Sequence, residues 1–216
     1  MIKIDLIRRP LLSSGVFIAM FVLFLFAPAP LIGDSIQVQA LKDYQLSKIR
    51  SALDLQEVKM SDDILARLTQ SIAAESEKHS LDPMLVMAII EVESRFDQRA
   101  VSPQGALGLM QVQPIVVAAL VEEGKISPAD KNLKLNLKDP VVNVKVGASY
   151  LAHLKDLFGD LKIALTAYNA GPTWVSKMIA AKQTLPLQYA TKVLSTQRSL
   201  EIRLARQGVS SMEVSG

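Results

Sequence analysis

Helix start signals recur along this chain, and they constrain its fold more than any other feature of the sequence. Asp82-Pro83 and Asp139-Pro140 each supply an acid for a helix cap and a proline for the first turn. Apolar residues follow both signals at helical spacing. No segment alternates convincingly between apolar and polar residues, as a half-buried strand would. The sequence therefore predicts an all-α domain over residues 61–195.

Composition narrows the class of protein further. With 216 residues, the chain has the length of one ordinary domain with appendages. Apolar residues make up 50% and charged residues 21%, which excludes a disordered chain. The net charge of +3 is too small to indicate nucleic-acid binding. Cysteine is absent, which excludes disulfides, thiolate metal sites and a cysteine nucleophile.

The first 33 residues have the pattern of an export signal or a membrane anchor. Their apolar core is unbroken from 16 to 27, and basic residues outnumber acidic ones in front of it. Ala27-Pro28-Ala29 offers a small-x-small cleavage site, but Pro30 follows and should obstruct a signal peptidase. We therefore expect residues 1–33 to be a signal peptide or N-terminal membrane segment, with an uncleaved anchor favoured and the remaining chain in the periplasm.

The rest of the chain divides by composition. Residues 34–60 are mixed and polar, so we expect a linker with some helix, and residues 196–216 are basic and then serine-rich, as in a C-terminal tail. The domain between them contains Tyr150, Phe158 and Trp174, aromatic residues that are more typical of a core than of a ligand platform. We see no internal repeat in it.

Few side chains could support catalysis. His79 and His153 are the only histidines, and neither has partner ligands at metal spacing, which argues against a zinc enzyme and a Ser-His-Asp triad. Gly105 and Gly108 form a GxxG without the Lys-Ser/Thr of a phosphate loop. We therefore expect no metal and no organic cofactor. The catalytic chemistry that these residues leave open is acid–base chemistry at a carboxylate.

Two glutamates lie on the helix that begins at Pro83. Glu91 and Glu93 project about 200° apart, so they cannot share a role. Glu91 lies four residues before Arg95 and is expected to pair with it on an exposed face. Glu93 has apolar residues on the preceding turn and Asp97 on the next, and both favour its protonated form. Such a carboxyl suits a general acid for a glycosidic oxygen, but spacing alone also allows a merely buried or capped Glu.

The segment after Glu93 carries a resemblance to a known family. Residues 93–97 read Glu-Ser-Arg-Phe-Asp, and residues 100–111 read Ala-Val-Ser-Pro-Gln-Gly-Ala-Leu-Gly-Leu-Met-Gln. This pattern resembles the signature of the lytic transglycosylases of the lysozyme-like superfamily, which carry a soluble-transglycosylase (SLT) module. Further blocks agree in order, namely Asp139-Pro140 with Gly147 to Leu151, Tyr168-Asn169-Ala170-Gly171-Pro172, and Tyr189 to Leu194. Together the blocks span about residues 70–195.

The resemblance implies a lysozyme-like fold and cleavage of the β-1,4 bond between MurNAc and GlcNAc of peptidoglycan without added water. It implies that Glu93 is the only catalytic carboxylate, first as acid and then as base, and that no protein nucleophile is needed. It also implies that Ser102 bonds near the acetamido and anhydro groups and that Gln111, Tyr168 and Asn169 line the same cleft. Gln113 departs from the family pattern, which more often has an apolar residue before the proline.

Two other functions compete with this one. A goose-type lysozyme would share the scaffold but deliver water to C1, and Asp97 is the nearest candidate base in the sequence. A noncatalytic wall-binding module or secretion-apparatus scaffold would have the same fold but no catalytic activity. The expected partners are peptidoglycan glycan strands and the inner membrane through the N-terminal segment, with possible recruitment to a wall-spanning assembly and no nucleic acid.

Overall fold

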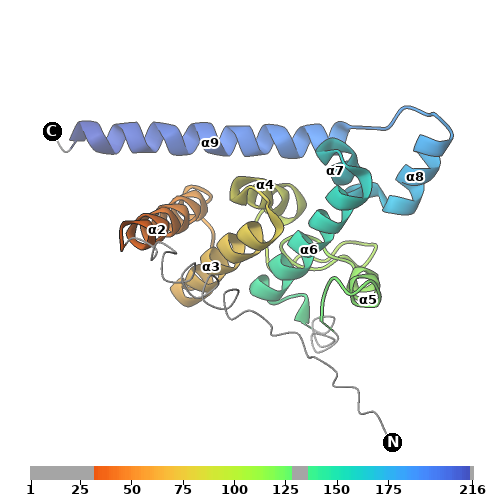
Figure 1. Cartoon of the computed structure of the whole chain (residues 1–216), viewed down its shortest axis with the longest axis horizontal. Coiled ribbons are helices and arrows are strands. Elements are labelled where there is room, and N and C mark those ends of the chain that lie inside the picture. Colours follow the sequence, from red (N-terminus) through yellow and green to blue (C-terminus); the bar gives the residue numbers. More distant parts are fainter. Residues whose placement is uncertain (1–31, 128–135, 215–216) are drawn as a thin grey trace, which may run out of the picture. The chain divides into compact units, whose positions relative to one another are not determined.

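The structure is a computed structural model that describes residues 32–127 and 136–214. Its elements, shown in Figure 1, are α2 (Ile32–Leu55), α3 (Asp62–His79), α4 (Pro83–Ser94), α5 (Pro114–Glu122), α6 (Pro140–Phe158), α7 (Leu161–Ala170), α8 (Pro172–Ala180) and α9 (Gln188–Val214). Between these helices, the described residues contain two isolated β-bridges and no strand. The prediction of a mostly helical chain is confirmed.

The chain forms two compact units, Met1–Lys42 and Asp43–Gly216, and helices α3 to α9 all belong to the second. The expected membrane segment falls mainly on residues 1–31, which lie outside the described ones. Among the helices that the structure describes, none has the length and apolar character needed to cross a bilayer.

The expected helix caps are confirmed. The Asp82 carboxylate accepts a hydrogen bond from the Met84 backbone N–H at 2.7 Å, with Pro83 in the first turn of α4. Asp139 accepts from two backbone N–H groups at the start of α6, at 2.9 and 3.1 Å. Each acid satisfies backbone donors that have no partner within the helix. These caps fix where the two central helices begin.

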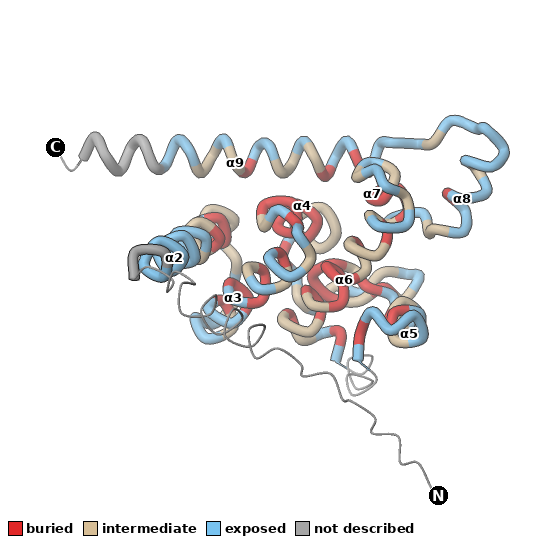
Figure 2. Tube along the Cα trace, in the orientation of Figure 1, coloured by how far each residue is buried: buried red, intermediate tan, exposed pale blue. Residues whose placement is uncertain are grey.

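Helix α4 lies at the centre of the second unit. Every residue from Met84 to Ile90 is buried, and a helix that is apolar all round is expected to pack on all sides. Helix α9 packs on α4 and on α7, and α6 packs on both α3 and α7 (Figure 1). Buried residues gather on α4 and α6 in Figure 2. The last turn of α4, which carries Glu93, is thereby held between helices distant in sequence.

The expected linker at 34–60 is largely helical, because α2 continues to Leu55. Its last turns bury Ile49, Ala52 and Leu53 in the main core. These three residues follow a helical spacing of three and four, but they stand in a polar stretch that dilutes the pattern. The part of this segment from residue 43 onward therefore belongs to the folded unit.

The expected tail from 196 also differs from the structure. Helix α9 runs without a break from Gln188 to Val214, and Leu200, beyond the expected boundary, is fully buried. Leu200 follows the buried Val193 by seven residues, which is two helical turns. Leu204, one turn further on, is partly buried against the same core, so the helix stays packed beyond residue 196.

The loop between α4 and α5 is held on α6 by one buried amide. Asn143 has no exposed surface, and its Nδ2 donates to the backbone oxygens of Leu107 and Leu137, both at 2.7 Å. Its Oδ1 accepts from the backbone N–H of Met110, also at 2.7 Å. Gly108 beside it has a φ of +72°, and a Cβ there would approach Asn143 Nδ2 to 2.5 Å. The loop can therefore dock only with glycine at this position.

We expect Asn143→Ala to lower the free energy of unfolding by about 2–4 kcal/mol, because three buried backbone groups would lose their partners. Urea denaturation of both proteins would measure the change. Asn136→Ala is the matched control, because Asn136 is exposed. Equal destabilisation by the two substitutions would contradict the role of Asn143.

Candidate active site

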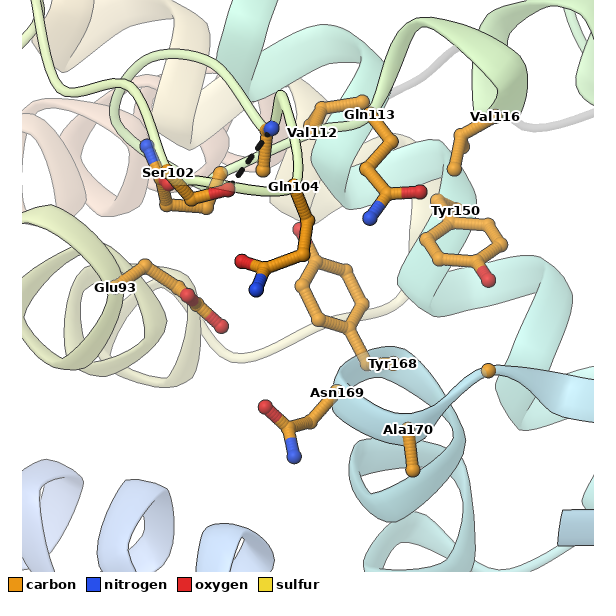
Figure 3. Close-up of a pocket in the computed structure, with 13 residues that line it drawn as sticks. Glu93, Ser102, Gln104, Val112, Gln113, Val116, Tyr150, Tyr168, Asn169 and Ala170 are labelled. Atoms are coloured by element: carbon orange, nitrogen blue, oxygen red, sulfur yellow. Dashed lines mark hydrogen bonds between the residues drawn. The ribbon is translucent and has the colours of Figure 1, made fainter. Parts of the chain in front are cut away.

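A cavity of about 400 Å³ opens between the end of α4, the loop that follows it, α6 and α7. Figure 3 shows Glu93 on one side of this cavity, with Tyr168 and Asn169 facing it from α7. The residues that line the cavity are Glu93, Ser102, Gln104, Ala106, Gln111, Val112, Gln113, Val116, Tyr150, Tyr168, Asn169, Ala170 and Gly171. The structure thus brings together the five residues singled out in the sequence, which are Glu93, Ser102, Gln111, Tyr168 and Asn169.

The Glu93 carboxyl is held by a tyrosine from the far end of the chain. Its Oε1 accepts a hydrogen bond of 2.5 Å from the hydroxyl of Tyr189 on α9. Burial raises the pKa of Glu93, whereas the Tyr189 hydrogen bond and the positive charge of Lys192 act in the opposite direction. Burial is the largest of these influences, so the carboxyl stays protonated to higher pH than an exposed Glu.

Asp97 does not act on Glu93 as expected. Its side chain is exposed, accepts a hydrogen bond from the Arg99 backbone N–H at 2.8 Å, and lines a different cavity. Burial and not a second acid is therefore what raises the pKa of Glu93. Glu93 is the only acidic residue among those that line its cavity.

Glu91 points to another part of the unit, as its position on the helix predicts. Its partners are different from the expected Arg95, which ends α4 in a left-handed conformation with a φ of 53°. Glu91 accepts a hydrogen bond from Gln56 and lies 3.9 Å from the guanidinium of Arg203. It thus connects α4 to the turn after α2 and to α9, away from the cavity.

Two tyrosines whose rings contact each other at a tilt form the wall opposite Glu93. The Tyr168 hydroxyl donates to the Met110 backbone oxygen at 2.8 Å, and its ring centroid lies 5.4 Å from that of Tyr150. Burial raises the pKa of Tyr168 well above its ordinary value, so the hydroxyl remains a donor. Tyr150 lines the cavity and, like Phe158, packs partly buried against the core. Trp174 is 40% exposed, so the expectation of a core position is wrong for this residue.

Ser102 and Gln111 shape the loop as well as lining the cavity. Ser102 Oγ accepts a hydrogen bond from the Ala106 backbone N–H at 3.0 Å, drawn as a dashed line in Figure 3. Gln111 has a φ of 48°, and its Nε2 donates to the backbone oxygens of Ala100 and Gly108 at 3.2 and 2.9 Å. Asn169 is exposed at the rim.

Sequence reasoning assigned no role to several residues of this site. Tyr189 was noticed only as part of a motif block, although it contacts Glu93 from 96 residues away. Gln104, Gln113 and Tyr150 also line the cavity. The unusual Gln113 before a proline was a usable signal, because a polar side chain there faces the cavity instead of the core (Figure 3).

The chemistry available in this cavity is acid–base chemistry at one carboxyl, surrounded by amides and hydroxyls that can bind a polar ligand. Within residues 32–127 and 136–214, no group of three or more His, Cys, Asp or Glu side chains could hold a metal ion.

We expect Tyr189→Phe to raise the pKa of Glu93 further, because the substitution removes a hydrogen bond that stabilises the ionised carboxylate. Titration of the isotopically labelled carboxyl by NMR would measure the shift. Tyr150→Phe serves as control, since Tyr150 lines the same cavity and does not influence the pKa of Glu93. A lowered pKa in Tyr189→Phe would refute this assignment.

We expect Glu93→Gln to gain stability relative to the native protein as pH rises above 4.5, the ordinary pKa of a glutamate. Above that value the unfolded chain gives up the Glu93 proton before the folded chain does, so the native protein loses stability while the glutamine variant does not. Thermal unfolding over a pH series would show this. If the variant instead lost stability relative to the native protein with rising pH, the pKa of Glu93 in the folded protein would be depressed.

Comparison with known proteins shows what this chain is similar to. The model of the transglycosylase SLT domain family matches residues 70–190. The transglycosylase of Enterobacteria phage PRD1 is 34% identical over 102 residues, covering 47% of this chain and 34% of the phage protein. The soluble lytic murein transglycosylase of Escherichia coli strain K12 is 38% identical over 98 residues, covering 41% of this chain and 14% of that protein.

The fold agrees as well. The crystal structure of the 70-kDa soluble lytic transglycosylase from Escherichia coli superposes with a TM-score of 0.56 at 23% identity, covering 76% of this chain and 31% of that one. The chain thus spans 34% or less of the length of these relatives. The segment matched by the family model contains every residue that lines the cavity. This chain therefore belongs to the transglycosylase SLT domain family.

Proposed function

We propose that this chain is a lytic transglycosylase that cleaves the β-1,4 bond between MurNAc and GlcNAc of peptidoglycan and leaves 1,6-anhydro-MurNAc ends. The observation that carries the proposal is a single carboxyl with a raised pKa, Glu93, in a cavity lined by no other acid. The names of the relatives, a transglycosylase and a lytic murein transglycosylase, support the same substrate.

In the first step, Glu93 acts as general acid. Tyr189 donates its hydroxyl hydrogen to Oε1, which leaves Oε2 as the oxygen that carries the proton. Burial raises the pKa of Tyr189, so the tyrosine stays a donor throughout. Glu93 transfers its proton to the glycosidic oxygen as that oxygen leaves C1 of MurNAc. The positive charge that develops at C1 is stabilised by the sugar's own acetamido group.

In the second step, the same group acts as general base. The Glu93 carboxylate accepts the proton of the C6 hydroxyl while the C6 oxygen attacks C1, which closes the anhydro ring. Glu93 thus ends protonated, as it began, and no water is consumed. The hydrogen bond from Tyr189 and the charge of Lys192 both stabilise the transient carboxylate between the two steps.

The surrounding residues would bind the sugar. Ser102 Oγ already accepts a hydrogen bond from Ala106, so its own hydrogen can be donated to the acetamido oxygen. The Tyr168 hydroxyl is bonded to Met110, so this residue contributes its ring face to the cleft. Gln111 shapes the loop, and Asn169 at the rim can reach sugar hydroxyls.

The proposed location is the periplasm, with residues 1–33 as the membrane segment. The charge pattern of that segment and the location of the proposed substrate outside the cytoplasmic membrane support this independently. Recruitment to a wall-spanning assembly is compatible with such a tethered enzyme.

The hydrolase alternative requires a base to activate water. Asp97, the nearest candidate in sequence, is exposed and lines a separate cavity, which favours the transglycosylase over a goose-type hydrolase. A noncatalytic scaffold would have no need for the raised pKa of a half-buried Glu93.

We expect Glu93→Gln to reduce cleavage of purified sacculi by about 10²–10⁴-fold, the usual contribution of general acid–base catalysis. Glu91→Gln is the matched control, because Glu91 occupies the same helix and faces away from the cavity. Mass spectrometry of the released muropeptides identifies the reaction of the native protein, for which we expect anhydro ends.

Reducing ends in place of anhydro ends would support the hydrolase. Full cleavage by Glu93→Gln would reject Glu93 as the catalytic acid. A native protein that releases no muropeptides while still binding sacculi would favour the scaffold.

A further inference from the structure

Trp174 is the only tryptophan of the chain, and it lies 40% exposed on α8. Its neighbour Val175 is fully buried and packs in a small core cluster with Leu154, Ala164 and Ala167. Val175 thus fixes α8 against α6 and α7. Adjacent helical residues are about 100° apart, so the buried face that holds Val175 leaves Trp174 at the surface on a well-anchored helix.

The position of Trp174 relates it to the cavity of Glu93. Ala170 and Gly171 line that cavity, and α8 begins at the next residue. Trp174 follows Gly171 by three residues, which is about 4.5 Å along the helix axis, and helical side chains lean towards the N-terminus. The backbone of Trp174 therefore lies within one helical turn of the Ala170–Gly171 end of the cavity. Figure 3 shows Ala170 on the side of the cavity away from Glu93.

The indole is not used by the fold. Among the described residues it makes no hydrogen bond and no ring contact, and most of the large apolar side chains on this unit are instead buried. Ile179 on the same helix is also exposed, at 44%, but it lies five positions after Trp174, which places the two side chains about 140° apart around the helix. The two residues do not form a continuous apolar face of the kind that a protein partner would cover. A single exposed aromatic ring near a polar cavity can instead bind one flat ring of a ligand.

A polymer substrate must extend beyond this cavity. The volume of about 400 Å³ lies in the lower part of the range for sites that enclose one small ligand, about 300–1,000 Å³. A β-linked aminosugar exposes C–H groups on the faces of its ring and polar groups around its edge. The indole is similarly an apolar plate with an N–H donor at its edge.

We propose that Trp174 is a binding platform on which a further aminosugar ring of the glycan strand stacks, beyond the Gly171 end of the cavity. The identity of the glycan rests on the proposed function, but the platform itself rests on the exposure and placement of Trp174. Its role is to bind long strands more tightly than short ones, without a part in the chemistry at Glu93.

Because no other tryptophan is present, intrinsic fluorescence reports on this position alone. The experiment uses the full chain carrying Glu93→Gln, titrated with the β-1,4-linked GlcNAc tetramer and hexamer. We expect the hexamer to shift the emission to shorter wavelength, because the stacked sugar removes water from the indole. Isothermal calorimetry on the same samples gives the affinities.

In the same Glu93→Gln background, we expect Trp174→Ala to weaken hexamer binding about tenfold, the effect of losing one well-packed aromatic contact. Trp174→Tyr keeps a stacking ring and should retain most of the affinity. Ile179→Ala is the matched control on α8 and should bind as the parent does, and circular dichroism checks that all variants fold.

Equal hexamer affinities for Trp174→Ala and its parent would overturn the platform, as would an emission spectrum unchanged by the hexamer. These outcomes are separate from the proposed function, which is tested by cleavage of sacculi with Glu93 intact. A protein that fails to cleave but binds the hexamer through Trp174 would keep the platform and lose the enzyme. A protein that cleaves sacculi but binds the hexamer equally well without Trp174 would keep the proposed enzyme and lose the platform.

Discussion

The cavity depends on one buried amide. Asn143 bonds two backbone oxygens and one N–H, and so ties the loop after α4 to the first turn of α6. That loop contributes Ser102 and Gln111 to the wall that faces Glu93. Since the loop contains almost no regular structure of its own, its shape must come from such long-range bonds. The tight fit at Gly108 shows how little freedom this arrangement leaves.

The protonation of Glu93 is controlled by two opposing effects from different parts of the chain. Burial at the end of α4 favours the neutral carboxyl, whereas Tyr189 and Lys192 favour the carboxylate. Tyr189 and Lys192 both lie on α9, and Glu91 pairs with Arg203 on the same helix. The packing of α9 on α4 therefore sets the chemistry of Glu93 as well as the stability of the core. In the proposed reaction Glu93 gives up a proton and then takes one back, and such a group benefits from having neither form strongly favoured.

Local patterns predicted the local features. The caps at Asp82 and Asp139 and the opposite directions of Glu91 and Glu93 follow from helical geometry, which needs only neighbouring residues. Asp97 shows where that geometry ends, because α4 stops at Ser94 and the next two residues have φ values of 53° and 63°. The rule that places residues four apart on one face then fails. The Tyr189 contact lay beyond prediction from the pattern because it joins elements 96 residues apart.

The polar groups around Glu93 bear on the choice between ring closure and hydrolysis. Gln104, Gln113 and Asn169 line the cavity with amides, which donate and accept hydrogen bonds but do not take up a proton at neutral pH. They can orient sugar hydroxyls, yet none can activate a water molecule. Glu93 is the only base in this wall, and in the proposed reaction it faces the C6 hydroxyl of the bound sugar. The proposed ring closure therefore needs no base besides Glu93, because the nucleophile is supplied by the substrate itself.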